Sequence, residues 1–212
     1  MFKHYETFLM VTAIKLLHIL MIMKEEQDKS HVSIALTNPK SPTNVGAVMR
    51  AAGCYQAAQV LYTGRRYEQA AKYNKDTLKT DTKNAQEKIP LLAVDDFINI
   101  KDLLENIPST AKVICVDLVE GATPLPHFIH PQHAVYIFGP EDGTIKQQVI
   151  DCADDVVYVP TVGCMNLAAS VNVLLYDRLA KSVTDQASSD SADNELIRSS
   201  RDTNNKVKVK LR

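Results

Sequence analysis

Short runs of β-branched and other apolar residues recur along this chain and alternate with segments of helical periodicity. The runs with strand character are residues 31–38, 57–64, 112–118, 134–139 and 155–160. Helical patterns occupy residues 43–53 and 94–107, and a last helix is expected to begin near Asn166. Strands that alternate with helices form a parallel sheet covered on both faces. The sequence therefore predicts an α/β fold with a mostly parallel sheet flanked by helices.

The two ends of the chain differ from its middle. Residues 8–23 are apolar, but Lys15 and His18 interrupt them, and the stretch is shorter than a membrane span and lacks a cleavage site. An amphipathic helix and an upstream extension of the reading frame both fit it. From residue 182 onward the chain is rich in Ser, Asp and Asn and ends in basic residues. We expect an N-terminal appendage over 1–30, one folded domain over 31–181 and a flexible, terminally basic tail over 182–212.

Charge and cysteine content limit the partners of the protein. The formal net charge is −1, so an attraction to RNA or to a membrane surface requires a local basic patch. No cysteine has the spacing of a metal site, and we expect neither a metal nor membrane attachment. Cys54, Cys115 and Cys152 are predicted to be buried thiols in a reducing compartment, which favours a cytoplasmic protein.

Three loops follow predicted strands with residues suited to binding. Parallel sheets bind ligands at the carboxyl ends of their strands. The first loop leads into a helix that carries Asn44, Gly46 and Arg50, the second is GPEDG at 139–143, and the third is VPTVGCMN at 159–166. The chain contains no GxGxxG or GxxxxGK[ST] phosphate cradle and no serine nucleophile elbow. Loops rich in backbone amides and poor in charge suit a flat base such as an adenine.

These three loops carry a resemblance to a known family. The pattern N-x-G-x-x-x-R, then FGPEDG, then VPTVGCMNLAASVNVLLYD resembles, in order and spacing, the motifs of the SpoU/TrmH branch of the SPOUT RNA methyltransferases. The resemblance covers residues 32–179, and the last motif is most similar to the compact members that methylate the 2′-hydroxyl of tRNA anticodon nucleotides.

The resemblance implies a fold that periodicity alone would reject, because knots are nearly absent from proteins. The C-terminal part is expected to thread through a loop as a deep trefoil knot around S-adenosylmethionine, and the last helix is expected to pack in a homodimer interface. No metal is required. The residues implied to line the donor pocket are Leu118, Glu120, Gly121, Ile137, Phe138, Gly139, Val159, Pro160, Cys164, Met165, Asn166 and Ala168.

The resemblance implies a 2′-O-ribose methyltransferase acting on tRNA or rRNA, with Arg50, Asn44, Glu141 and Asn166 as catalytic residues. A guanidinium stays protonated, so Arg50 suits phosphate anchoring and charge stabilisation better than proton removal. The alternative is that Arg50 only forms a salt bridge with Glu141. Asn166 is also the expected N-cap of the last helix. Glu141 is expected to order Asn44 or Arg50, the alternative being a solvated turn residue.

RNA contact is expected on the basic segment around residues 40–88. Its candidate RNA-binding residues are Lys40, Arg50, Arg65, Arg66, Lys72 and Lys75, with Tyr67 and Tyr73 between them as possible stacking partners for a base. The alternative for each lysine is a solvated charged loop.

Cys164 departs from the family, whose members usually carry Ser at this position. A thiol is a weaker hydrogen-bond donor than a hydroxyl. This position therefore motivates a second interpretation, a catalytically weakened RNA-binding protein with the same fold. Asn44, Arg50, Glu141 and Asn166 are intact, which favours the enzyme.

Overall fold

The computed structural model describes residues 30–73, 89–103, 107–183, 190–201 and 204–209. Its centre is a seven-stranded sheet in the order β3-β2-β1-β6-β4-β7-β5. Every neighbouring pair of strands is parallel, as the alternation of strands and helices predicted. The strands are β1 His31–Leu36, β2 Gln59–Tyr62, β3 Leu91–Ala93, β4 Lys112–Val116, β5 Thr123–Pro124, β6 His133–Phe138 and β7 Asp155–Tyr158. The α/β prediction is confirmed.

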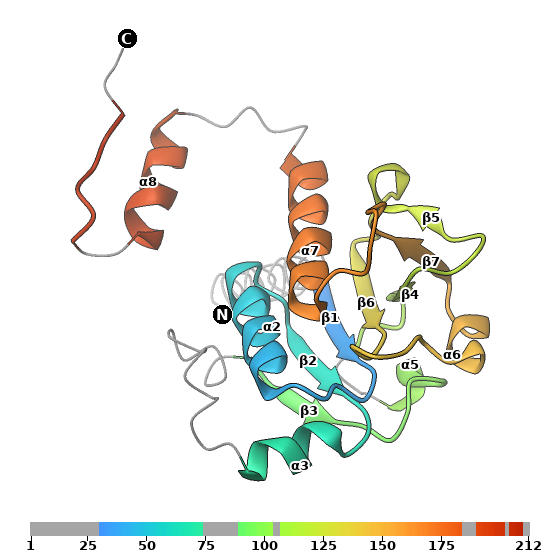
Figure 1. The fold of residues 1–212 in the computed structure, drawn as a ribbon. Helices are drawn as coiled ribbons and strands as arrows, with labels where there is room; N and C mark the ends of the chain where they lie inside the picture. The colour runs from blue at the N-terminus through green and yellow to red at the C-terminus, as the bar shows by residue number, and fades with distance from the viewer. Residues whose placement is uncertain (1–29, 74–88, 104–106, 184–189, 202–203, 210–212) are drawn as a thin grey trace, which may run out of the picture.

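Helices cover both faces of the sheet (Figure 1). On one face α2 (Pro42–Cys54) and α7 (Leu167–Val183) lie side by side, and residues such as Val45 and Leu174 pack there against the strands. On the other face lie the short helices α5 (Ile100–Leu103) and α6 (Gln147–Asp151). In β1, Ile34 belongs to the first core and Ala35 to the second, as the two-residue period of a strand requires. The sheet is therefore buried on both sides.

The remaining helices lie at the periphery. They are α3 (Arg66–Tyr73), a 3₁₀ helix at Leu125–His127, and α8 (Asp190–Ser200). No helix in the described ranges combines the length and apolar character that a membrane crossing needs.

One predicted helix is much shorter than expected. The pattern over 94–107 predicted a long helix, but only Ile100–Leu103 is helical in the described part of this segment. The carboxylate of Asp96 accepts a hydrogen bond from the backbone N–H of Ile98 at 2.9 Å, a local turn that competes with helix formation. Phe97 and Ile100 are nevertheless buried, at 2% exposure each. The regular helix over this range was wrong, although apolar side chains of the segment are buried.

Two further expectations are corrected. The tail was predicted to lack structure, but Asp190–Ser200 forms α8. Arg198 in its last turn complements the helix dipole, while Leu196 and Ile197 remain exposed. Of the three cysteines predicted to be buried, only Cys115 is; Cys54 ends α2 and Cys152 follows α6, and both are exposed because they lie at helix ends rather than inside strands. The proposed appendage over 1–30 lies outside the described residues except for Ser30.

The strand order has a consequence for the chain path. Because β7 lies between β4 and β5, the connection 117–122 between those two strands crosses the carboxyl end of β7, where the chain leaves toward α7. A knotted passage needs such a covering segment. The trefoil knot itself stays a prediction.

Candidate functional site

The helix α2 begins at a well-formed cap next to the end of β1. The hydroxyl of Ser41 accepts a hydrogen bond from the backbone N–H of Asn44 at 3.2 Å, and Pro42 occupies the first turn, where its missing N–H costs nothing. The cap fixes Asn44 in the first turn of the helix, close to the carboxyl end of β1.

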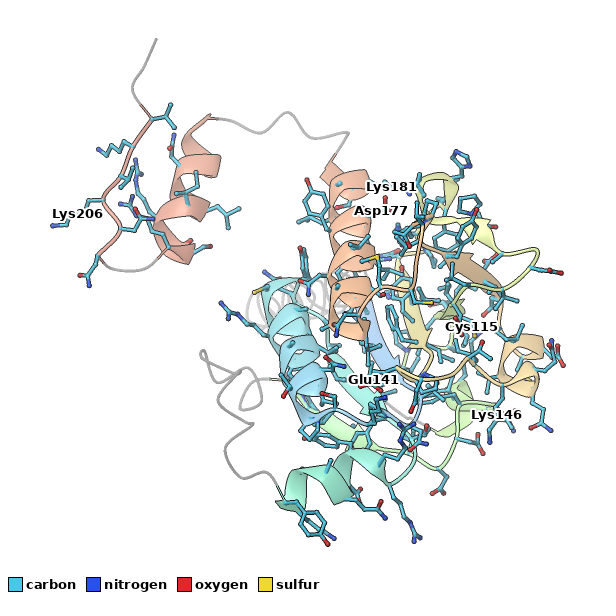
Figure 2. The ribbon with its side chains drawn as sticks, in the orientation of Figure 1. Cys115, Glu141, Lys146, Asp177, Lys181 and Lys206 are labelled. Carbon is cyan, nitrogen blue, oxygen red and sulfur yellow. The ribbon has the colours of Figure 1, made fainter. Side chains whose placement is uncertain are left out.

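Glu141, in the loop after β6, binds the start of α2. Its Oε1 accepts hydrogen bonds from Asn44 Nδ2 at 2.9 Å and from the backbone N–H of Ser41 at 3.2 Å, and its Oε2 accepts from the backbone N–H of Lys40 at 2.9 Å. Partial burial acts to raise the pKa of Glu141, but these hydrogen bonds outweigh it and hold the pKa below its ordinary value. The carboxylate is therefore charged at neutral pH, and Glu141 orders Asn44 rather than Arg50. Figure 2 shows Glu141 close to the starts of α2 and α7.

Asn166 joins this pair from the third loop. Its Nδ2 donates to Asn44 Oδ1 at 3.0 Å, and its Oδ1 accepts from the backbone N–H groups of Ala168 and Ala169 at 2.9 and 3.4 Å. Asn166 therefore caps α7, as the sequence indicated. A continuous chain of hydrogen bonds, Glu141–Asn44–Asn166, links the loops that follow β1, β6 and β7. We call it the amide relay.

Arg50 lies outside the amide relay. It is exposed on α2, six residues after Asn44, which is about 9 Å along the helix axis. In the described residues Arg50 forms no ion pair, so the alternative of a salt bridge with Glu141 is not what the structure shows. Its side chain is available for an external anion.

The residues implied to bind the donor are divided between exposed loops and buried strand ends. Ile137 and Phe138 are buried in the two cores, so only their backbone faces the loops. Ala168 is buried, Val159 and Met165 are partly buried, and Leu118, Glu120, Pro160 and Cys164 are exposed. Gly121 has a φ of +88° and open space where a Cβ would stand.

Asp117, which follows β4, was not singled out in the sequence. Its carboxylate accepts hydrogen bonds at 2.8 Å from the backbone N–H groups of Leu118 and Ile145 and from the hydroxyl of Thr144. A Cβ added to Gly139 would lie 2.9 Å from its Oδ2. Asp117 therefore ties the loop after β4 to the loop after β6 and requires Gly at 139. Its position directly after a buried strand was the only available signal.

A cluster of ion pairs lies at the rim of these loops. Asp142 Oδ1 and Oδ2 accept bidentate hydrogen bonds from Arg66 at 2.9 and 2.8 Å, and Lys40 Nζ is 3.3 Å from Asp142 Oδ2. The hydrogen bond with Arg66 is the main reason that the pKa of Asp142 falls to about 2. We call Lys40, Arg66 and Asp142 the rim cluster. Asp142 was not among the predicted site residues.

The other predicted RNA-binding residues fall in three groups. Arg65 and Lys72 are exposed, and Tyr73 is 89% exposed. Tyr67 instead packs edge-on against Tyr62 with a centroid distance of 5.2 Å, so it is not free to stack a base. Lys75 lies outside the described residues.

A second polar cluster lies at the opposite edge of the sheet. His130 contacts the hydroxyl of Tyr136 at 2.7 Å and the carboxylate of Asp177 at 2.9 Å, and Arg178 donates to Tyr136 at 3.0 Å. Lys181 also pairs with Asp177 at 2.6 Å, and Figure 2 shows these two side chains together near the end of α7. These contacts join α7 to β6 and to the segment before it. In the described ranges, no group of three or more His, Cys, Asp or Glu side chains is placed to hold a metal.

Comparison with known proteins adds a family and a fold. The model of the SpoU rRNA Methylase family matches residues 31–176. A search of curated protein sequences finds no match.

Among solved structures, the SpoU methyltransferase AviRb from Streptomyces viridochromogenes, in complex with the cofactor AdoMet, is 18% identical with a TM-score of 0.63. That alignment covers 74% of this chain but only 60% of AviRb. The structure described as "Structural insights into the 2-OH methylation of C/U34 on tRNA" is 19% identical with a TM-score of 0.60, and covers 73% of this chain and 98% of that one. The TrmH/SpoU tRNA modifying enzyme of A. aeolicus is 15% identical with a TM-score of 0.55, and covers 81% and 87%. These likenesses show a shared fold.

Proposed function

Since this chain belongs to the SpoU rRNA methylase family, we propose that it transfers a methyl group from S-adenosylmethionine to a ribose 2′-hydroxyl of RNA. The observation that carries the proposal is the amide relay, which joins the three motif loops at the carboxyl ends of β1, β6 and β7. Ligand sites of parallel sheets lie at this edge.

The loops after β4, β6 and β7 have the features that S-adenosylmethionine needs. Leu118 and Val162 expose apolar side chains, at 53% and 111%, on the loops after the paired strands β4 and β7. A Cβ added to Gly121 or Gly163 would meet no atom within 4 Å, so a flat base can approach the backbone there. When bound, the donor supplies a methyl group activated by a sulfonium leaving group. The backbone of Ile137–Gly139 and residues 159–168 would complete the pocket.

The proposed roles follow from the contacts. Both ends of the Asn44 amide are engaged, since Nδ2 binds Glu141 and Oδ1 binds Asn166, so its orientation is fixed. Asn166 keeps one N–H of its amide for the substrate ribose, and the charge of Glu141 orders the relay. Arg50 is free of partners in the described residues and anchors a phosphate beside the target hydroxyl.

The substrate class is tRNA or rRNA. Exposed Arg65, Lys72 and Tyr73 on and before α3 supply phosphate contacts and a stacking surface. We place the enzyme in the cytoplasm, where these RNAs occur.

A homodimer is part of the proposal. Val173, Tyr176 and Leu179 lie three residues apart on α7 and are 36%, 63% and 48% exposed. This spacing places them along one side of the helix, and a second copy of the chain would bury them.

The test uses purified protein, donor labelled in its methyl group, and bulk tRNA or rRNA. Arg50→Ala is expected to lower methyl transfer about a hundredfold, because the target hydroxyl is no longer held in line with the donor, with donor affinity nearly unchanged. Arg198→Ala, which changes an exposed arginine on α8, is the matched control. Intact donor and RNA binding without any transfer by the unmutated protein would instead support the weakened RNA-binding protein.

A further inference from the structure

Asp142 brings together two cations from distant segments. Lys40 comes from the loop after β1 and Arg66 from the start of α3, and both reach the same carboxylate oxygen, Oδ2, at 3.3 and 2.8 Å. Arg66 makes a second hydrogen bond to Oδ1 at 2.9 Å. Without the carboxylate, the two positive charges would repel each other and their long side chains would separate.

The rim cluster remains accessible and cationic. The side chains of Lys40, Arg66 and Asp142 are 47%, 33% and 48% exposed. A guanidinium has five N–H donors and an ammonium three, and Asp142 occupies two of the first and one of the second. Within the cluster, two positive charges and one negative charge leave a net charge of about +1 with donors to spare, and the nearby Glu141 carboxylate partly offsets it.

The position of the cluster connects it to the reaction site. Asp142 follows Glu141 directly, and the backbone N–H of Lys40 donates to Glu141 Oε2. The loop after β6 therefore contributes Glu141 to the amide relay and Asp142 to the rim cluster. The carboxylate of Asp142 fixes the two cations at the edge of the site.

We propose that Asp142 is a positioning residue for RNA binding: its carboxylate holds Lys40 and Arg66 together as a cation pair that binds one phosphate group of the RNA at the rim of the site. This inference rests on the proposed function. A phosphate has two charged oxygens, and two cations held at a fixed separation bind it better than two independent side chains, because less side-chain freedom is lost on binding.

The experiment measures the affinity of the full chain for fluorescently labelled bulk tRNA and bulk rRNA over a range of salt concentrations. Asp142→Asn removes the charge and keeps the size. It is expected to weaken RNA binding about fivefold, the upper range for an exposed ion pair. The slope of log K against log[salt] should become shallower by a little under one, which is the value for one lost phosphate contact. Arg66→Ala is expected to do the same. The loss in the double variant should be smaller than the sum of the two single losses, because Asp142 acts partly through Arg66.

Asp151→Asn is the matched control. It makes the same change in net charge at the end of α6, away from the carboxyl edge of the sheet. It is expected to leave RNA affinity unchanged or slightly increased.

The outcomes separate this inference from the proposed function. Unchanged or tighter RNA binding by Asp142→Asn would show that the carboxylate only screens the cations, and would overturn the inference. Losses of RNA affinity that simply add in the double variant would overturn it too. The proposed function stands if the unmutated protein transfers methyl groups, whatever the variants of Asp142 show. If the unmutated protein binds neither RNA, both are overturned.

Discussion

Removing the carboxylate of Glu141 is expected to destabilise the protein measurably. Glu141→Ala leaves the backbone N–H groups of Lys40 and Ser41 and the amide of Asn44 without their acceptor. Each such hydrogen bond is worth about 1 kcal/mol net, and water replaces part of it because the site is only partly buried, so the free energy of unfolding should fall by about 2 kcal/mol. For a folded unit of this size, the melting temperature should fall by about 4 to 8 °C.

The assay is thermal unfolding followed by circular dichroism at neutral pH, without RNA or donor. Glu195→Ala, an exposed position on α8, is the control. Glu141→Gln keeps one acceptor oxygen and should lie between the two. A melting temperature for Glu141→Ala equal to that of the control would refute the view that this carboxylate holds the loops together.

The pH dependence gives an independent check on Glu141. Because the folded pKa lies below the ordinary value, the stabilisation is present above that ordinary value and is lost as the pH falls through the lowered pKa. The difference in stability between the unmutated protein and Glu141→Gln should therefore shrink under acid conditions. A difference that stays constant with pH would point to lost packing instead of lost charge.

Three further predictions test the surroundings. Burial acts to raise the pKa of Asp154, but hydrogen bonds from the backbone N–H of Val113 and from Lys101 and Lys112 lower it to about 2. Asp154→Asn should therefore cost about 1 kcal/mol in urea unfolding at neutral pH and progressively less as the pH falls from about 4 to 2. His130→Ala should reduce the free energy of unfolding by about 2 kcal/mol near pH 7, because the hydrogen bonds of the imidazole are lost. Burial lowers the pKa of His130, so protonation of this group reduces stability at acid pH, and the variant should lack that decline. Cys164→Ser should keep methyl transfer within about twofold, since serine restores the size and a stronger donor; a large loss would assign the thiol a role.

Five of the seven strands were predictable because their signals are local, whereas β3 and β5 were not predicted. The β-branched runs gave strand positions within two or three residues, as for β6, expected at 134–139 and found at His133–Phe138. The helix expected over 94–107 failed because one side chain, Asp96, captures a backbone N–H that the helix would need. Apolar periodicity does not report such competition.

The site was predictable only where a motif marked it. Asn44, Glu141 and Asn166 come together although they are far apart in the sequence, and the motif order indicated this. Asp142 was missed because its partners lie 76 and 102 residues away, and Asp117 because its partners lie up to 28 residues away; an aspartate in a loop has no pattern that identifies such a partner. Ion pairs between loops depend on the fold as a whole.

The position of Glu141 also determines where an RNA phosphate can bind. The backbone N–H groups that lead into α2 already donate to this carboxylate, and the first N–H groups of α7 donate to Asn166. These helix starts would otherwise attract a phosphate. A phosphate in direct contact with the charged Glu141, with no cation between them, would be repelled, whereas a neutral ribose hydroxyl would not. We therefore expect the hydroxyl to lie at the amide relay and the phosphates to lie at Arg50 and the rim cluster, so that anchoring and chemistry use different groups on the same loops.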